Sequence, residues 1–358
     1  MSISRPGVAI VGLGLIARTH ATAYRALADA GKVNLAAVCD IDAEKAQAFA
    51  AQFGGKPVTS LDDVITDHAV DVIDLILPHH VHLAAALAVI NADKHLIMEK
   101  PVADNVADSE TIVRAAQAAG IHFQVAENTR YAVAYQAVEK LIREGAIGEV
   151  VHARTYLRSN EKPHLSMPGY WRTQRKFGGG LILDTGAHSF YLLKWLLGEI
   201  TEVTAFGTKV IPLPNEIEDT AEVRGRFASG AVFSSGFTSV SEIPHSERLE
   251  LYGTTGGILL DQMSDPVVRL WRGAHDFAAE TVEGVPYGPD AWHPGGWHWE
   301  SVLVEVADFI DSLLEGRKPL CEPWDTVYAI RVIEAAYESI RTGAPVKIAP
   351  VAEDAAVS

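Results

Sequence analysis

The sequence predicts an α/β protein of two domains: a doubly wound parallel sheet first, then an α+β domain built on a mostly antiparallel, open sheet. The chain has 358 residues, which is more than one compact core usually holds. Its first third alternates short apolar runs with helical patterns, as a parallel sheet requires. From about residue 150, strand patterns follow one another with little helix between them, which indicates an antiparallel sheet.

The first domain is expected to span residues 1–127. Ala-rich stretches at 43–53 and 81–91 carry apolar residues at helical spacing. A sixth strand could follow the helix that begins near Tyr135. The five strands predicted before that helix are 8–12, 35–40, 72–77, 95–99 and 122–126.

The second domain is expected to span residues 128–350. Helical periodicity returns at 301–343, where Gly316, Pro319 and Pro323 divide the stretch into two helices that could pack on either domain. The strands predicted for this domain are 151–157, 202–210, 220–227, 231–239, 248–252 and 257–261.

Composition excludes several classes of partner. The formal net charge of −16 opposes binding to phosphate backbones and anionic lipid, so we expect neither nucleic acid nor membrane as a partner. No stretch of roughly 18 consecutive apolar residues is present. Cys39 and Cys321 are too few for a disulfide framework, which favours a cytoplasmic protein. An apolar stretch follows Arg5, but it contains the glycine motif described next, so we do not interpret it as a signal peptide.

A glycine motif follows the first predicted strand. Gly12, Gly14 and Ala17 form G-x-G-x-x-A at the start of a helix, the pattern of a Rossmann domain that holds a dinucleotide pyrophosphate on the helix N-terminus. Asp40 ends the second predicted strand, where a carboxylate can accept the adenosine ribose hydroxyls. The same carboxylate repels a 2′-phosphate, and Ile41 follows it rather than a basic residue. The sequence therefore predicts NAD rather than NADP as the cofactor.

Further segments resemble one family. Glu99-Lys100-Pro101 follows the fourth predicted strand, and Gly178 to Gly180 lead into Asp184, Gly186 and His188. With the glycine motif, these segments make nearly the whole chain similar to the Gfo/Idh/MocA oxidoreductases, which include sugar and inositol dehydrogenases. The resemblance implies that Lys100 lies between nicotinamide and substrate. It also implies that His188 accepts the hydroxyl proton, with Asp184 as its partner or as a substrate acceptor.

The resemblance and the strand ends together name a wider set of site residues. Many members of the family have an acid three residues after the histidine, whereas this chain has Tyr191. The resemblance therefore does not fix the route by which the proton leaves the histidine. The expected catalytic residues are Lys100, Asp184 and His188. The expected cofactor contacts are Gly12, Gly14, Leu15, Ile16, Asp40, Pro78, His79, His82, Glu99, Lys100, Asn128, Trp171 and Arg172. The expected substrate contacts are Lys100, Arg130, Tyr131, Tyr156, Asp184 and His188.

Two clusters of ring side chains suggest other roles. Trp292, His293, Trp297, His298 and Trp299 could stack on the C–H faces of sugar rings, or they could be core or subunit contacts. By contrast, the histidines at positions 79, 80 and 82 lack a nearby converging ligand, so we expect no metal site there.

Three functions remain open at this point. The leading one is an NAD-dependent dehydrogenase that moves a hydride between nicotinamide and a hydroxyl carbon of a sugar, glycoside or polyol. The second is an NAD-dependent glycoside hydrolase, which oxidises C3 transiently and regenerates its cofactor. The third is a non-catalytic NAD-binding sensor. One face of the second sheet is expected to lack helices of its own, which favours a homodimer or homotetramer.

Overall fold

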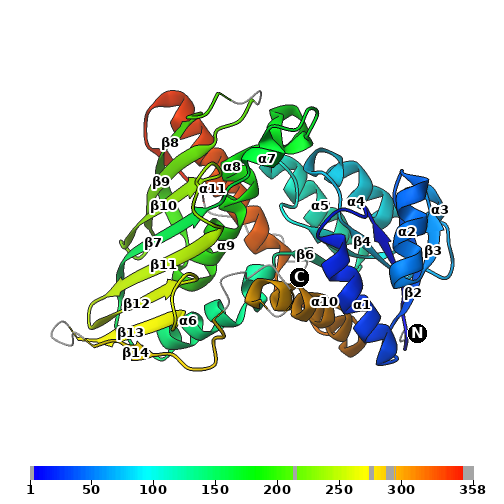
Figure 1. The fold of residues 1–358 in the computed structure, drawn as a ribbon, viewed down its shortest axis with the longest axis horizontal. Coiled ribbons are helices and arrows are strands. Elements are labelled where there is room, and N and C mark those ends of the chain that lie inside the picture. Colours follow the sequence, from blue (N-terminus) through cyan, green and yellow to red (C-terminus); the bar gives the residue numbers. More distant parts are fainter. Residues whose placement is uncertain (1–3, 213–215, 274–277, 288–293, 295, 350–358) are drawn as a thin grey trace. The chain divides into compact units, whose positions relative to one another are not determined.

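A computed structural model describes residues 4–212, 216–273, 278–287, 294 and 296–349 of the chain. The chain divides into two compact units (Figure 1). Unit 1 consists of Met1–Tyr131 with His298–Val327, and unit 2 consists of Ala132–Trp297 with Tyr328–Ser358. Among the described residues, no helix combines the length and the apolar character needed to cross a membrane.

Unit 1 is built on a six-stranded sheet in which every pairing is parallel. The strand order is β3-β2-β1-β4-β5-β6, so the winding direction reverses between β1 and β4. This confirms the predicted doubly wound sheet. The strands are β1 (Gly7–Val11), β2 (Asn34–Cys39), β3 (Lys56–Val58), β4 (Val72–Leu75), β5 (His95–Glu99) and β6 (Phe123–Ala126).

The sixth strand of this sheet is not the one that the sequence suggested. The prediction of a sixth strand after the helix near Tyr135 is wrong, because the strand that follows that helix joins the sheet of unit 2. The sixth strand is instead β3, at the sheet edge. It has three residues and contains Pro57, which an edge position tolerates because one side needs no ladder hydrogen bond. Such a strand is too short to give an alternating pattern.

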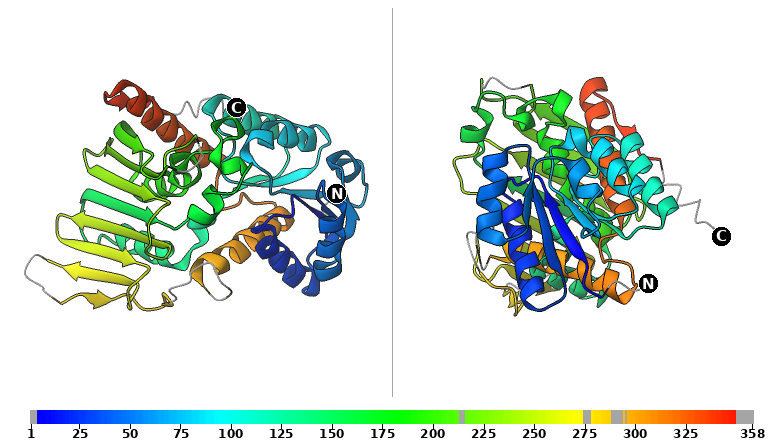
Figure 2. Two further views of the ribbon diagram at one scale, coloured as in Figure 1. Left: turned by 45° about the horizontal axis from the view of Figure 1, so that its top comes forward. Right: turned by 90° about the vertical axis from the view of Figure 1, so that its right-hand side faces the viewer.

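Helices cover both faces of the unit 1 sheet, as the right-hand view of Figure 2 shows. On one face, Val64, Val89 and Ile112 from three helices form a core with the buried strand residues. On the other face, Tyr24 and Phe309 contribute to a second core. The first core uses α3 (Leu61–Ile65), α4 (His82–Asn91) and α5 (Val106–Ala119); the second uses α1 (Ala17–Asp29), α2 (Ala43–Phe53) and α10 (Trp297–Glu315).

Unit 2 is built on a nine-stranded sheet of order β14-β13-β12-β11-β7-β10-β9-β8-β15. Every pairing is antiparallel except that of β7 with β10, which confirms the predicted, mostly antiparallel sheet. The last three strands in the list below were not predicted. The strands are β7 (Val150–Arg158), β8 (Ile200–Thr208), β9 (Thr220–Phe227), β10 (Val232–Thr238), β11 (Ser246–Gly253), β12 (Gly256–Asp261), β13 (Val268–Arg272), β14 (Glu280–Thr281) and β15 (Val346–Lys347).

The helices of unit 2 lie on one face of its sheet (Figure 1). Phe190 of α9 contacts Phe233 and Phe237 of β10 edge to face, and the Ser339 hydroxyl of α11 accepts the Ala205 N–H of β8. The terminal helical stretch therefore divides: α10 packs in the core of unit 1, whereas most of α11 belongs to unit 2. The helices are α6 (Val133–Arg143), α7 (Lys162–Leu165), α8 (Leu181–Asp184), α9 (Gly186–Leu197) and α11 (Pro323–Thr342).

Candidate functional site

The turn between β1 and α1 has the geometry that the glycine motif predicted. Gly12 has φ of +90°, and a Cβ built on it would lie 2.1 Å from the carbonyl oxygen of Ile76. A Cβ on Gly14 would meet nothing within 4 Å, so the backbone there faces open space. No side chain caps the N-terminus of α1. The Arg18 and Thr19 N–H groups bond to the carbonyls of Leu15 and Ile16, so the part that can face an anion is the backbone from Gly14 to Ala17, a cradle that fits a pyrophosphate.

Asp40 lies at the end of β2, beside this turn. Its Oδ2 accepts the Leu13 N–H at 3.0 Å and lies 2.6 Å from Lys45 Nζ, while its Oδ1 accepts the Asp42 N–H at 3.1 Å. Burial opposes ionisation, but these hydrogen bonds outweigh it and lower the pKa of the Asp40 carboxyl. A charged acceptor is therefore held next to the glycine turn, as ribose binding requires.

Two apolar side chains beside Asp40 are exposed. Leu15 is 88% exposed and Ile41 is 95% exposed, whereas Ile16 packs against the core of unit 1. Exposed apolar side chains next to a polar cradle fit contact with the flat face of a nucleotide base. This arrangement agrees with a cofactor contact for Leu15 and gives Ile16 a packing role.

The segment after β4 contains the predicted residues Pro78, His79 and His82. Pro78 precedes a short 3₁₀ turn (η1, His79–Val81) that begins with the buried His79. His82 is fully buried, with Nδ1 2.9 Å from the Pro101 carbonyl oxygen and Nε2 2.9 Å from that of Leu77. Burial lowers the pKa of His82. The ring thus ties the end of β4 to the segment after Lys100, and no surface of it is left for a cofactor.

Lys100 follows the last residue of β5, and Asn128 follows β6 within a 3₁₀ turn (η2, Asn128–Tyr131). Glu99 pairs with Ala126 in the sheet register, so Lys100 and Asn128 leave adjacent strands at the same edge. The Asn128 side chain donates to Ser301 Oγ at 2.8 Å. The carboxyl ends of β1, β4, β5 and β6 all open on this edge, where ligands of doubly wound sheets bind.

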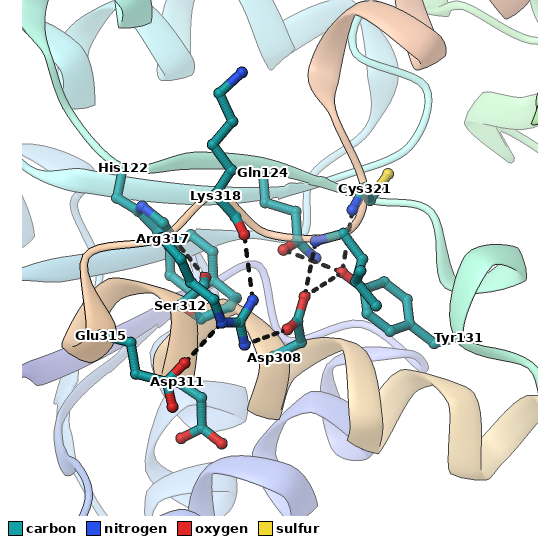
Figure 3. Close-up of polar contacts among 12 residues, drawn as sticks. His122, Gln124, Tyr131, Asp308, Asp311, Ser312, Glu315, Arg317, Lys318 and Cys321 are labelled. Carbon is teal, nitrogen blue, oxygen red and sulfur yellow. Dashed lines mark hydrogen bonds and ion pairs between the residues drawn. The ribbon is translucent and has the colours of Figure 1, made fainter.

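Tyr131 lies in a buried network rather than at an open surface (Figure 3). Its hydroxyl lies 2.8 Å from Asp308 Oδ2 and accepts the Cys321 N–H at 3.3 Å. Arg317 Nη2 lies 2.6 Å from the other Asp308 oxygen. Burial raises the pKa of the Tyr131 hydroxyl, which keeps it neutral. We correct its expected role: Tyr131 anchors the segment after α10, whereas the neighbouring Arg130 is partly exposed.

In unit 2, Asp184 and His188 belong to two different helices. Asp184 is the last residue of α8, and His188 lies in the first turn of α9 beyond the junction at Thr185. Thr185 itself has α-helical backbone angles, φ −92° and ψ −39°, so the backbone stays helical in conformation between the two residues. Asp184 Oδ2 lies 3.5 Å from Arg172 Nη1, and Arg172 stacks over the Trp171 ring at 5.3 Å. Asp184, Arg172 and Trp171 thus form one charged and aromatic cluster.

Tyr156 is placed differently from expectation, and two members of the ring cluster take the packing role that the sequence left open. Tyr156 alternates with the buried Thr155 and Leu157, so it lies on the face of the unit 2 sheet opposite α9. Trp297 is buried and contacts Tyr135 edge to face, and His298 is buried as well. These positions indicate packing rather than sugar stacking for Trp297 and His298. Trp292 and His293 lie outside the described residues, and Tyr191 is fully buried in α9.

Unit 1 also contains a buried polar group that was not predicted from the sequence. His20 of α1 has Nδ1 2.8 Å from Asp74 Oδ2 and Nε2 3.3 Å from Glu99 Oε1. Glu305 of α10 is buried nearby and interacts electrostatically with His20. The available signal was an acid inside an otherwise apolar strand, because Asp74 interrupts the run from Val72 to Leu77. Among the described residues, no group of three or more His, Cys, Asp or Glu side chains forms a candidate metal site.

Known proteins resemble the chain along nearly all of its length. An inositol 2-dehydrogenase of Salmonella paratyphi B is 32% identical, over 93% of this chain and 94% of that protein. A levoglucosan dehydrogenase of Pseudarthrobacter phenanthrenivorans is 29% identical, over 86% of this chain and 89% of that one. A solved structure of levoglucosan dehydrogenase in complex with NADH and levoglucosan has a TM-score of 0.85 at 25% identity, covering 97% of this chain and 100% of that one.

Two family models match the two sheets separately. The oxidoreductase family model with an NAD-binding Rossmann fold matches residues 7–127, and the model of the GFO/IDH/MocA C-terminal domain matches residues 135–259. The first match covers the glycine turn, Asp40 and Lys100, and the second covers Asp184 and His188. The chain therefore belongs to the GFO/IDH/MocA family of NAD-binding oxidoreductases.

Proposed function

We propose that the protein is an NAD-dependent dehydrogenase that oxidises a hydroxyl carbon of a sugar, glycoside or polyol. The observation that carries this proposal is the composition of one sheet edge in unit 1. The open turn at Gly14, the charged Asp40 and the position of Lys100 all lie at the carboxyl ends of its parallel strands. The names of the relatives, an inositol 2-dehydrogenase and a levoglucosan dehydrogenase, support the substrate class.

The proposed chemistry assigns one task to each of three side chains. When bound, NAD supplies the nicotinamide that accepts a hydride. Lys100 donates a hydrogen bond to the reacting hydroxyl oxygen and stabilises the negative charge that develops there. His188 accepts the O–H proton, so the carbon–oxygen single bond becomes a carbonyl as the C–H hydrogen leaves with both electrons. Asp184, held by Arg172, accepts hydrogen bonds from a neighbouring substrate hydroxyl.

A substrate panel tests the proposal. The wild-type protein is incubated with NAD and a series of inositols, aldoses, anhydrosugars, sugar acids and glycosides, and NADH absorbance is followed. We expect net NADH formation with at least one sugar or polyol. Hydrolysis of a glycoside without net NADH would instead assign the hydrolase function, and binding of NADH without turnover of any compound would assign a sensor.

Site variants then test the residue roles. Lys100→Met removes the proposed donor and is expected to abolish turnover while NADH affinity stays near the wild-type value. Lys56→Met removes an exposed lysine of β3 and is the matched control, which is expected to keep full activity. His188→Ala is expected to lose activity most strongly near neutral pH and to regain part of it as the pH rises, because hydroxide can then accept the proton in place of the imidazole. Wild-type turnover by Lys100→Met would refute the assignment.

We also propose a homodimer or homotetramer that forms through the outer face of the unit 2 sheet. Exposed side chains on that face include Tyr156, Phe206, Val232 and Tyr252, and they are interspersed with arginines. Cys39 and Cys321 are both buried and form no disulfide, which supports a reducing, cytoplasmic location. Light scattering after size-exclusion chromatography tests the assembly: a monomer would refute it, and Phe206→Asp is expected to weaken the oligomer.

A further inference from the structure

One buried polar cluster of unit 1 takes no part in the chemical steps assigned above. It centres on His20, which α1 places between β4 and β5 with no solvent exposure. His20 Nδ1 lies 2.8 Å from Asp74 Oδ2 on β4, and Nε2 lies 3.3 Å from Glu99 Oε1 at the end of β5. A single imidazole therefore connects the helix of the dinucleotide turn to the strand that ends next to Lys100.

The surroundings of His20 favour its charged form. Burial alone would disfavour an imidazolium, but the carboxylates of Asp74 and Glu99 outweigh that penalty and raise the pKa of His20 well above 6.5. Other groups of the cluster come from α1, α10 and the segment after β6: Tyr24, Glu305 and Glu127.

These outer groups leave the central pairing intact. Burial, together with repulsion by nearby carboxylates, raises the pKa of Glu305 well above its ordinary value, which favours the neutral form of this acid. Burial likewise raises the pKa of Tyr24, which is neutral too. Glu127 is engaged by the Thr129 hydroxyl at 2.5 Å. The closest acidic partners of His20 are therefore Asp74, at 2.8 Å from Nδ1, and Glu99, at 3.3 Å from Nε2.

The residues on either side of Lys100 are both held by buried imidazoles. Glu99, one residue before it, contacts His20, and the carbonyl of Pro101, one residue after it, lies 2.9 Å from His82 Nδ1. Lys100 itself is partly exposed at the end of its strand. Fixing the backbone on both sides limits the directions in which its side chain projects, and a misplacement of about 1 Å in an active site can cost a factor of about 100 in rate.

We propose that His20 is a positioning residue for the reaction: oriented by Asp74, it holds the Glu99 carboxylate and thereby fixes the chain end from which Lys100 projects. The proposal rests on the function proposed above, because it assumes that Lys100 acts on the substrate. It assigns no contact of His20 with substrate or cofactor. The contact that matters is the one from Nε2 to Glu99, whereas the contact from Nδ1 to Asp74 sets the ring orientation.

Two substitutions separate these contacts. A glutamine amide reaches the position of Nε2, so His20→Gln keeps a donor toward Glu99; an asparagine amide reaches the position of Nδ1, so His20→Asn keeps a donor only toward Asp74. Both variants lose the ring and its charge, so their melting temperatures are expected to fall together. We expect kcat to fall about 10- to 100-fold in His20→Asn, with most of that loss recovered in His20→Gln. NADH affinity is expected to stay near wild type in both.

Glu305→Gln is the matched control for the cluster, because it replaces an acid whose burial favours the neutral form with an amide of the same shape. Its kcat is expected to equal that of the wild type. Equal kcat losses in His20→Asn and His20→Gln would overturn the proposal, and so would a loss confined to melting temperature or NADH affinity. Either result would make the cluster a purely structural one.

A readout that needs no turnover keeps this proposal separate from the proposed function. An amine-specific acylating reagent modifies Lys100 at a rate that depends on the position and accessibility of its amino group. Peptide mass spectrometry measures this rate. We expect this rate to change in His20→Asn and to return toward the wild-type value in His20→Gln. If the wild type oxidises nothing in the panel, the proposed function fails, while the labelling rates still decide whether His20 positions Lys100. Unchanged labelling in both variants would refute the positioning role.

Discussion

Replacing the two glycines of the dinucleotide turn by alanine should separate folding from cofactor binding. At Gly12, φ of +90° disfavours any Cβ, at a cost of about 1–2 kcal/mol. The new Cβ would also lie 2.1 Å from the Ile76 carbonyl oxygen, a backbone atom that cannot rotate away. Overpacking of this kind costs about 1–3 kcal/mol, so Gly12→Ala should lower the free energy of unfolding by about 2–5 kcal/mol.

Gly14 gives the opposite expectation, because a Cβ there would meet nothing within 4 Å. Gly14→Ala should leave the free energy of unfolding unchanged or raise it by about 0.4–1 kcal/mol, because alanine reduces the conformational entropy of the unfolded chain. Its methyl group would occupy the space through which the backbone approaches a pyrophosphate, so NADH affinity should fall.

Thermal unfolding and NADH fluorescence titration measure the two effects. For Gly12→Ala, the expected loss corresponds to a melting temperature about 4–20 °C below that of the wild type. Gly14→Ala should melt with the wild type and bind NADH more weakly. A Gly12→Ala protein that melts at the wild-type temperature would refute the steric argument, and wild-type NADH affinity in Gly14→Ala would refute the location of the cradle.

Three further predictions concern other contacts of unit 1. Asp40→Ala removes the proposed ribose acceptor and frees the Lys45 ammonium group, which lies 2.6 Å from Asp40 in the wild type, to approach a 2′-phosphate. NAD affinity should fall about 10- to 100-fold, and the ratio of NADP to NAD affinity should rise. Titration with both cofactors measures these changes. Burial lowers the pKa of His122 to about 4, so the unfolded chain binds more protons, and stability should decrease as pH falls from about 6.5 toward 4. His122→Gln should flatten that decrease in urea titrations at a series of pH values. Tyr131→Phe removes the hydroxyl that serves Asp308 and the Cys321 N–H, and it should cost about 1–3 kcal/mol in the same urea assay, with little change in NADH affinity.

Local patterns in the sequence were sufficient to predict the two sheets and the cofactor turn. Apolar runs separated by helical stretches predict parallel strands, and β1, β2, β4, β5 and β6 formed where the runs lie. The glycine motif predicted a turn in which Gly12 needs a positive φ and Gly14 needs open space. Each of these features depends on backbone conformation and on side chains close together in the chain, so a short window of sequence contains the relevant information.

The pairing of short strands and the surroundings of individual side chains became clear only from the tertiary structure. β3 forms because β2 offers an edge on which three residues can pair, although those residues have no strand pattern of their own. Tyr156 belongs to a correctly predicted strand, yet the face on which it lies became clear only once α9 was placed on the other side. Whether an aromatic or a polar side chain is a ligand contact or a packing residue depends on what covers it.

The buried contacts show why local sequence patterns do not predict long-range pairs. His20 meets Asp74 across 54 positions of sequence, and Tyr131 meets Asp308 across 177. Neither member of such a pair carries a local signal of its partner, because the contact free energy arises only when the chain has closed the loop between them. The sequence alone therefore determined the sheet types, the cofactor turn and the family, whereas tertiary packing decided which polar side chains are buried and which others they contact.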